Sequence, residues 1–281
     1  MTLTSASTGP APDLPISEVG RVRVHHLAQA KRRAEKLTML TAYDAIVAGI
    51  FDEAGIDILL VGDSMGTTVL GMPSTLTVTL DDAERATKAV ATSVRRALIV
   101  ADLPFGTYDD SPEHAFTSAV RLMRAGAHAV KFEGGRRVAS QVRLIASAGI
   151  PVIGHMGFTP QSEHGLGGPR IQGRDPASLD SLTADALALE EAGASAIVLE
   201  LMPADAAATL TQTLQIPTIG IGAGPHCDAQ VLVWTDMAGL TRRPPRFVKA
   251  FGQARRDLQA AAGAYAEAVR RGAYPDPEHS Y

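Results

Sequence analysis

Short apolar segments of this chain repeatedly end in a polar side chain that can do acid–base or metal chemistry. The segment LLVGDSMG brings Asp63 and Ser64 directly after aliphatic residues. Asp102 follows the apolar run in LIVADLPF, and Lys131 and Glu133 close the run in AVKFEGG. Such carboxylates, with no cysteine beside them, favour a hard cation such as Mg2+ or Ca2+. A single aspartate after a strand is as readily the N-cap of the next helix. The metal site is predicted because a carboxylate follows several apolar runs in succession.

Lys131 stands two residues before Glu133, which places both side chains on one face of a strand. Its ammonium suits a substrate carboxylate. The alternatives are a Schiff-base lysine and an ion pair that keeps both charges solvated. The Schiff base is the less attractive of these, because a metal nearby already polarises a carbonyl.

Three further strand ends carry Tyr43 in LTAYD, His155 in VIGHMGFT and Glu200 in AIVLELMP. Glu200 is flanked by leucines, and an apolar setting raises the pKa of a carboxylate and suits a general base. A helix cap or a salt bridge is the alternative for Glu200. His155 fits a substrate contact or a buried structural histidine. The Gly-rich stretch 163–175 is predicted to form a mobile loop over the site, with its charges solvated.

Apolar runs alternate with longer, Ala-rich amphipathic stretches. The predicted strands cover residues 37–40, 56–61, 97–101, 129–132, 151–153, 195–199, 217–221 and 230–234. The predicted helices between them include residues 83–95, 112–125, 138–148 and 184–192. Buried strands alternating with helices indicate a parallel sheet, and eight units favour a (β/α)8 barrel over a doubly wound open sheet. In a barrel the C-terminal strand ends share one rim, so the polar side chains above face one mouth.

Composition bounds the remaining possibilities. The chain has 281 residues, 46% of them hydrophobic, and a net charge of −4, which gives no reason to expect a nucleic-acid partner. The single cysteine, Cys227, excludes an internal disulfide framework. No apolar stretch is long enough for a membrane helix, and we expect a cytoplasmic protein. We predict a disordered leader over 1–20, the barrel over 21–251, and a helical tail over 252–281. The tail is expected to pack on the barrel or on a neighbouring subunit.

Seven strings resemble the ketopantoate hydroxymethyltransferase family in family order. They are TAYD, LLVGDSMGTTVLG, ADLPFGTY, VKFEGG, GHMGFTPQ, VLELMP and GIGAG followed by CDAQVLVW. The resemblance implies a (β/α)8 TIM barrel of the phosphoenolpyruvate/pyruvate type. It implies transfer of a hydroxymethyl group from 5,10-methylenetetrahydrofolate to 3-methyl-2-oxobutanoate, giving ketopantoate and tetrahydrofolate in pantothenate synthesis. Mg2+ and a homodecamer of two stacked pentameric rings are also implied.

Residue roles follow from the same resemblance. It makes Asp63 and Asp102 metal ligands, with Glu133 bound directly or through water. Asp63, Ser64 and Asp102 would also contact the keto acid, and Lys131 would bind its carboxylate. Glu200 resembles the proton acceptor, which generates an enolate that Mg2+ stabilises.

The sequence departs from the family pattern at two positions, and two other functions are alternatives to the one that the resemblance implies. Phe132 stands where a smaller aliphatic residue is common, and Ala229 where glycine is usual. The nearest rival is a metal-dependent carbon–carbon lyase of the isocitrate-lyase or pyruvate-aldolase type. Such a lyase normally carries a cysteine in a Cys-Gly-His-type loop, and Cys227 has a different setting. The other rival is a binding barrel without catalysis.

Overall fold

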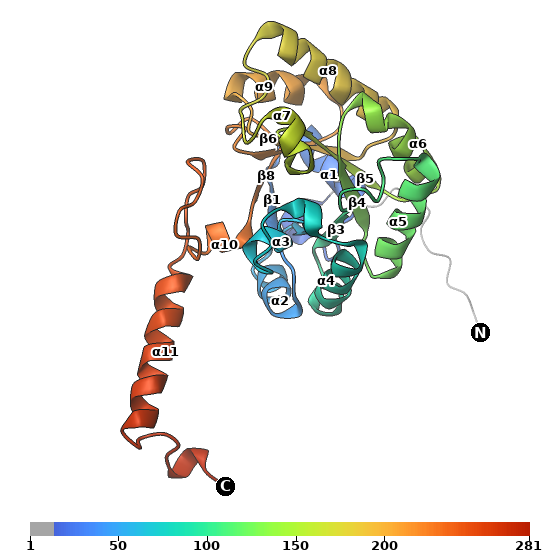
Figure 1. Ribbon diagram of the computed structural model, residues 1–281. Helices are drawn as coiled ribbons and strands as arrows, with labels where there is room; N and C mark the ends of the chain where they lie inside the picture. The colour runs from blue at the N-terminus through green and yellow to red at the C-terminus, as the bar shows by residue number, and fades with distance from the viewer. Residues whose placement is uncertain (1–13) are drawn as a thin grey trace, which may run out of the picture.

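The computed structural model describes residues 14–281, and its core is a closed barrel of eight parallel strands (Figure 1). Each strand pairs with the next along the chain, and the last pairs with the first, so the open-sheet alternative is wrong. The strands are β1 (Leu37–Thr41), β2 (Ile58–Val61), β3 (Leu98–Asp102), β4 (Ala129–Glu133), β5 (Val152–Gly157), β6 (Ala196–Glu200), β7 (Thr218–Ile221) and β8 (Ala229–Leu232). The predicted eighth strand runs too far, because Trp234 already begins a helix.

Helices follow most strands, and the longer ones other than the last cover the outside of the barrel (Figure 1). The α-helices of the described residues are α1 (Val24–Arg32), α2 (Ala45–Glu53), α3 (Met65–Thr68), α4 (Leu80–Ser93), α5 (Pro112–Arg124), α6 (Ala139–Ser147), α7 (Glu163–Leu166), α8 (Pro176–Glu191), α9 (Ala204–Thr213), α10 (Trp234–Met237) and α11 (Ala254–Arg270). Helix α8 begins before the predicted start at residue 184, because Asp175 and Ser178 form a capping box and Pro176 occupies the first turn. None of the described helices has the length and apolar composition needed to cross a membrane.

Side-chain alternation along each strand creates two apolar layers. Leu98 and Val100 of β3 belong to the cluster inside the barrel, whereas Ile99 and Ala101 pack against the surrounding helices. The next inward position on this strand is Asp102. The same happens on β6, where Ala196 and Val198 are followed by Glu200. The inward rows therefore turn from apolar to polar at the C-terminal end of the barrel.

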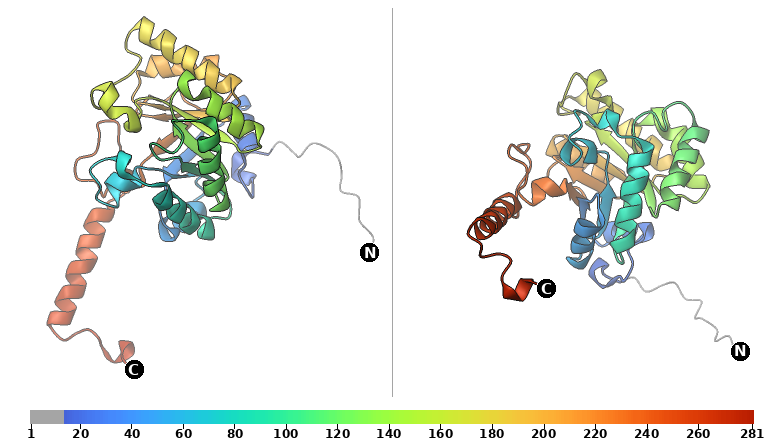
Figure 2. Two further views of the ribbon diagram at one scale, coloured as in Figure 1. Left: turned by 45° about the vertical axis from the view of Figure 1, so that its right-hand side comes forward. Right: turned by 60° about the horizontal axis from the view of Figure 1, so that its bottom comes forward.

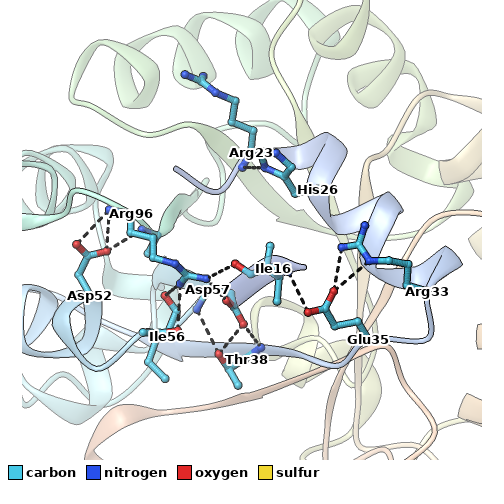
Figure 3. A network of polar contacts seen from close by, with 12 residues as sticks. Ile16, Arg23, His26, Arg33, Glu35, Thr38, Asp52, Ile56, Asp57 and Arg96 are labelled. Carbon is cyan, nitrogen blue, oxygen red and sulfur yellow. Dashed lines mark hydrogen bonds and ion pairs between the residues drawn. The ribbon is translucent and has the colours of Figure 1, made fainter. Parts of the chain in front are cut away.

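The N-terminal face of the barrel is closed by the segment before α1. Ile16 and Val19 are only 5% and 7% exposed, and a short 3-10 helix spans Ile16–Glu18. Arg96 donates to the carbonyl of Ile16 at 2.7 Å, and Glu35 accepts from its N–H at 2.9 Å (Figure 3). The predicted disordered leader is therefore wrong over residues 14–20, where two apolar side chains are buried. Its residues 1–13 lie outside the described part of the chain.

Helix α11 projects away from the barrel in every view (Figures 1 and 2). None of its residues is buried, and Leu258, Tyr265 and Val269 are 63%, 61% and 44% exposed. Its first turn is tied to the preceding segment, since Ala254 N–H donates to the carbonyl of Ala238 and Arg255 Nη1 to that of Leu240, both at 2.9 Å. The tail contains a helix, and this helix does not pack on its own barrel. Packing on a neighbouring subunit, the other alternative for the tail, stays a prediction.

Candidate active site

A cavity of about 110 Å³ opens at the C-terminal end of the barrel. The predicted site residues that line it are Asp63, Ser64, Asp102, Lys131, Glu133, His155 and Glu200. Tyr43 does not line this cavity, but its hydroxyl is 2.8 Å from the hydroxyl of Ser64. The structure thus brings the predicted site residues into one mouth, with Tyr43 one contact away from it.

The strand register explains how these side chains meet. Asp102 of β3 is level with Lys131 of β4, and Glu133 of β4 is level with His155 of β5. Glu200 of β6 is level with Gly157, the last residue of β5. Gly157 has φ +87°, and a Cβ there would lie 2.2 Å from the carbonyl oxygen of Glu200. Only glycine allows β5 to pass the end of β6 so closely.

Lys131 and Asp102 form a buried ion pair with 2.8 Å between Nζ and Oδ1. Burial opposes the charge of Lys131, but attraction to Asp102, Glu133 and Asp63 outweighs it and raises the pKa of the ammonium. Lys131 therefore keeps its proton, which disfavours the Schiff-base alternative. The pair is enclosed rather than solvated, since both side chains are almost fully buried.

The pKa of Asp63 reflects the crowding of carboxylates at the mouth. Burial, and then repulsion by Asp102 and Glu133, raises the pKa of Asp63 from 3.8 to about 7. Its backbone N–H donates to Oδ2 of Asp102 at 3.1 Å, so the two aspartates are direct neighbours. The cap alternative fails for Asp63, whose carboxylate accepts from a glutamine, and holds for Asp44, which caps α2.

His155 connects two of the acids. Its Nδ1 lies 3.2 Å from Oε1 of Glu133, and its Nε2 lies 3.1 Å from Oε2 of Glu200. Burial and the nearby Lys131 would lower its pKa, but the hydrogen bonds to Glu133 and Glu200 prevail and raise the pKa of His155 to about 9. The imidazolium therefore donates to both carboxylates at neutral pH.

Glu200 is the least enclosed acid of the group, with 17% of its side chain exposed at the mouth. The apolar setting expected from its neighbours is wrong, because Leu199 faces the helical layer while Glu200 faces His155. The next residue, Leu201, has φ +48°, a left-handed conformation that costs about 1 kcal/mol in a residue with a Cβ. Such strain directly after a reactive side chain is typical of functional sites.

The Gly-rich stretch begins with the short helix α7, and its charged residues His164, Arg170 and Arg174 are exposed. They are solvated, as the sequence predicts.

Two residues of the site were missed by the sequence reasoning. Gln161 donates from its side chain to Asp63 and from its backbone to Glu133. Tyr108 donates to the Gln161 carbonyl oxygen. Both are uncharged, so neither belongs to a ligand or acid–base pattern. The signal that was available is that they end the strings ADLPFGTY and GHMGFTPQ.

The donor set fits one divalent cation. With all four carboxylates ionised, the acids exceed the cations by two charges, from Asp63, Asp102, Glu133 and Glu200 against Lys131 and His155. Oxygen donors of this kind suit Mg2+. As the side chains stand, no three His, Cys, Asp or Glu residues within 14–281 are placed so that they could hold a metal ion together. A cation here would therefore need water or substrate oxygens, or a shift of the side chains, to complete its ligand shell.

Structural neighbours place the fold. The chain superposes on phosphonopyruvate hydrolase in complex with oxalate and Mg2+ with a TM-score of 0.60 and 14% identity, covering 92% of this chain and 93% of that one. It superposes on 2,3-dimethylmalate lyase, a PEP mutase/isocitrate lyase superfamily member, with a TM-score of 0.57 and 17% identity, covering 92% and 91%. These neighbours share the fold of the chain, a closed (β/α)8 barrel.

Sequence relatives place the family. The chain is 60% identical to 3-methyl-2-oxobutanoate hydroxymethyltransferase of Acidothermus cellulolyticus, over 93% of this chain and 97% of the relative. It is 54% identical to the enzyme of that name from Thermobifida fusca, over 98% and 99%. The sequence pattern that defines ketopantoate hydroxymethyltransferases matches residues 21–277. The chain belongs to the ketopantoate hydroxymethyltransferase family.

Proposed function

We propose that the chain transfers a hydroxymethyl group from 5,10-methylenetetrahydrofolate to 3-methyl-2-oxobutanoate, giving ketopantoate and tetrahydrofolate. The observation that carries the proposal is the single mouth in which a buried lysine, an excess of carboxylates and a histidine-paired glutamate meet. The reaction needs these three elements: a cation for the substrate carboxylate, a means to stabilise an enolate, and a base at C3.

Mg2+ is the proposed metal, held by Asp63 and Asp102 and by Glu133 directly or through water. When bound, it would supply the electrostatic stabilisation of the enolate oxygen. Support comes from the uncompensated charge of the acids and the raised pKa of Asp63, because a divalent cation relieves that repulsion. The oxalate and Mg2+ of phosphonopyruvate hydrolase support it too, since oxalate offers two adjacent oxygens, like a 2-keto acid.

The remaining steps are assigned to side chains at the mouth. Lys131, protonated and facing the cavity, binds and orients the keto-acid carboxylate. Ser64, backed by Tyr43, contacts the substrate at the edge of the mouth. Glu200 takes the proton from C3, and its hydrogen bond to His155 fixes the carboxylate in the direction of the cavity.

The cavity size separates the two substrates. About 110 Å³ suits a small keto acid and is well below the 300 Å³ or more typical of pockets for drug-sized ligands. We therefore assign the folate to the outside of the mouth, with the 163–175 stretch and the Gly220–Gly224 turn as its candidate contacts.

A homo-oligomer is proposed as well, with the decamer as its expected form. The apolar residues Leu258, Tyr265 and Val269 of α11 are exposed on a helix that leaves its own barrel (Figure 2). A subunit interface would bury them. Light scattering of the full chain and of a variant with all three residues changed to Ser tests this. An unchanged oligomer would remove α11 from the interface.

Proton NMR in D2O tests the function. The chain is mixed with 3-methyl-2-oxobutanoate and Mg2+ or EDTA, and methylenetetrahydrofolate is then added. We expect loss of the C3 proton signal with Mg2+ but not with EDTA, followed by new hydroxymethyl signals. Exchange without transfer would point to a lyase, although Cys227 is fully buried and does not line the mouth. Absence of both would favour the barrel without catalysis.

A further inference from the structure

The carboxylates of the mouth are connected by an uncharged residue from the loop after β5. Gln161 lies in a short 3-10 helix, Pro160–Ser162, and is 6% exposed. Its Nε2 donates to Oδ2 of Asp63 at 2.8 Å and to the carbonyl of Leu103 at 3.1 Å. Its backbone N–H donates to Oε2 of Glu133 at 2.9 Å. One residue thus holds acids that come from the ends of two different strands, β2 and β4.

Tyr108 fixes which way the Gln161 amide faces. Its hydroxyl accepts from the backbone N–H of Glu133 at 3.3 Å and donates to Oε1 of Gln161 at 2.5 Å. An amide rotated by half a turn would place Nε2 against a hydroxyl proton and Oε1 against two acceptors. These partners favour the observed orientation, in which Nε2 faces Asp63 and the carbonyl of Leu103.

Packing holds Tyr108 itself in place. The side chain is fully buried, and its ring lies 5.1 Å from the ring of Phe132, centroid to centroid. The backbone carbonyl of Tyr108 accepts from Nε2 of Gln141 at 3.2 Å. Phe132, the departure noted in the sequence, therefore supports the phenol that orients the amide.

The chemistry of an amide suits this position. Asp63 and Glu133 repel each other, so they do not keep a fixed separation by themselves. A lysine or arginine here would hold them but would cancel the charge that attracts a cation. An amide donates hydrogen bonds to the carboxylates and leaves their full charge available.

We propose that Gln161, oriented by Tyr108, is a positioning residue that holds Asp63 and Glu133 in the arrangement that a divalent cation requires. This inference rests on the proposed metal site of the function above. Outer partners of metal-binding carboxylates typically change metal affinity by about tenfold to a hundredfold when they are replaced.

The test measures Mg2+ binding and folding separately in the full chain. Gln161→Asn shortens the side chain so that it cannot reach both Tyr108 and Asp63. Tyr108→Phe removes the orienting proton and keeps the ring. Gln29→Asn is the matched control, because it makes the same change in a partly buried glutamine of α1 that does not line the mouth. Each protein is stripped with EDTA, its thermal unfolding is recorded, and Mg2+ is then titrated by calorimetry.

We expect the Mg2+ dissociation constant to rise about tenfold to a hundredfold in Gln161→Asn and about threefold to tenfold in Tyr108→Phe. In the double variant the Mg2+ dissociation constant should rise by less than the product of the two single-variant factors, because both side chains act through one hydrogen-bond chain. Gln29→Asn should lower thermal stability slightly and leave the dissociation constant within about twofold. If Gln161→Asn does not fold, Tyr108→Phe decides the result.

Three outcomes overturn the inference, and they differ in what they say of the function. Unchanged affinity in both site variants removes the positioning role and leaves the proposed function intact. An equal loss in Gln29→Asn shows general loosening of the barrel instead of positioning. Absence of Mg2+ binding in the unmodified chain overturns the proposed metal site itself.

Discussion

The two ends of the barrel differ in whether their enclosed acidic side chains are paired with cations. At the N-terminal face, the buried Asp57 pairs with Arg96 at 2.8 Å, and the partly buried Asp228 pairs with Lys31 at 2.9 Å. At the C-terminal mouth, carboxylates outnumber cations. The N-terminal network in Figure 3 also uses the remaining hydrogen-bonding capacity, since Arg96 binds the carbonyls of Gly55 and Ile56.

The difference separates stability from function within one sheet. Where every buried charge is paired and hydrogen-bonded, removal of one partner is costly and the network fixes the fold. Where like charges crowd together, the folded state is destabilised unless a ligand of opposite charge binds. The raised pKa of Asp63 is the physical mark of the second kind of site.

Glu200→Gln should abolish most catalysis while keeping the mouth intact. Glutamine can still accept a hydrogen bond from His155 but cannot take a proton, so we expect turnover to fall by about 10²–10⁴-fold. Keto-acid affinity should stay within about threefold, because binding energy of the ground state is retained. Proton exchange by NMR and calorimetric titration of the keto acid check both. Exchange near the unmodified rate would remove Glu200 as the base.

Asp63→Asn should weaken metal binding and stabilise the metal-free chain. We expect Mg2+ affinity to fall at least about tenfold, since a charged ligand is lost. Between pH 3.8 and about 7 the folded state holds a proton on Asp63 that the unfolded chain has released, so stability falls as pH rises through this window. Asp63→Asn does not undergo this loss. We expect its free energy of unfolding to exceed that of the unmodified chain by up to about 4 kcal/mol near pH 8 and by almost nothing near pH 4.

Calorimetry with Mg2+ and urea unfolding of the EDTA-treated proteins at both pH values measure these two effects. A variant less stable than the unmodified chain at the higher pH would contradict charge crowding at the mouth.

Arg96→Met should destabilise the fold and leave the site intact, which is the reverse of the effect expected for Asp63→Asn. It leaves Asp57, which is 5% exposed, without its cation, and we expect a loss of about 3 kcal/mol in the free energy of unfolding. Turnover should be unchanged, because the site lies at the opposite end of the strands. Arg85→Met is the control. Arg85 pairs with Asp82 at the surface, so we expect this variant to lower the free energy of unfolding by less than about 0.5 kcal/mol. Urea unfolding and turnover of both variants provide the comparison.

His128→Asn should give the smallest effect. Burial, together with Arg21 and Arg23, lowers the pKa of His128 from 6.5 to about 4, while its Nδ1 accepts from Ile99 N–H. The unfolded chain gains a proton first as pH falls through this window, so stability is lost between pH 6.5 and 4.

Asparagine keeps the acceptor and does not titrate. We expect the variant to lose about 1 kcal/mol less across this window, after allowing for solvent screening of the partly exposed ring. Urea unfolding at several pH values measures the slope. Parallel stability curves for the two proteins would remove His128 as a contributor.

Much of the mouth was predictable because strands show short-range patterns. The apolar runs ending in Asp63, Asp102 and Glu133 identify both the strand and its reactive end. The pairing of His155 with Glu133 and Glu200 was not predictable, because it depends on the register between β4, β5 and β6. The register is a property of the closed barrel and leaves no local mark in the sequence.

The sequence by itself determined the barrel, the side chains at its C-terminal rim and the family of the chain. These follow from apolar alternation and from motifs that are local in the chain. Only the tertiary structure decided which acids crowd together, which side chains orient them, and that α11 leaves its own barrel. The physical reason is that pKa values and hydrogen-bond direction depend on distances between residues far apart in sequence. Gln161 and Asp63 illustrate this, since Nε2 and Oδ2 meet at 2.8 Å across 98 positions.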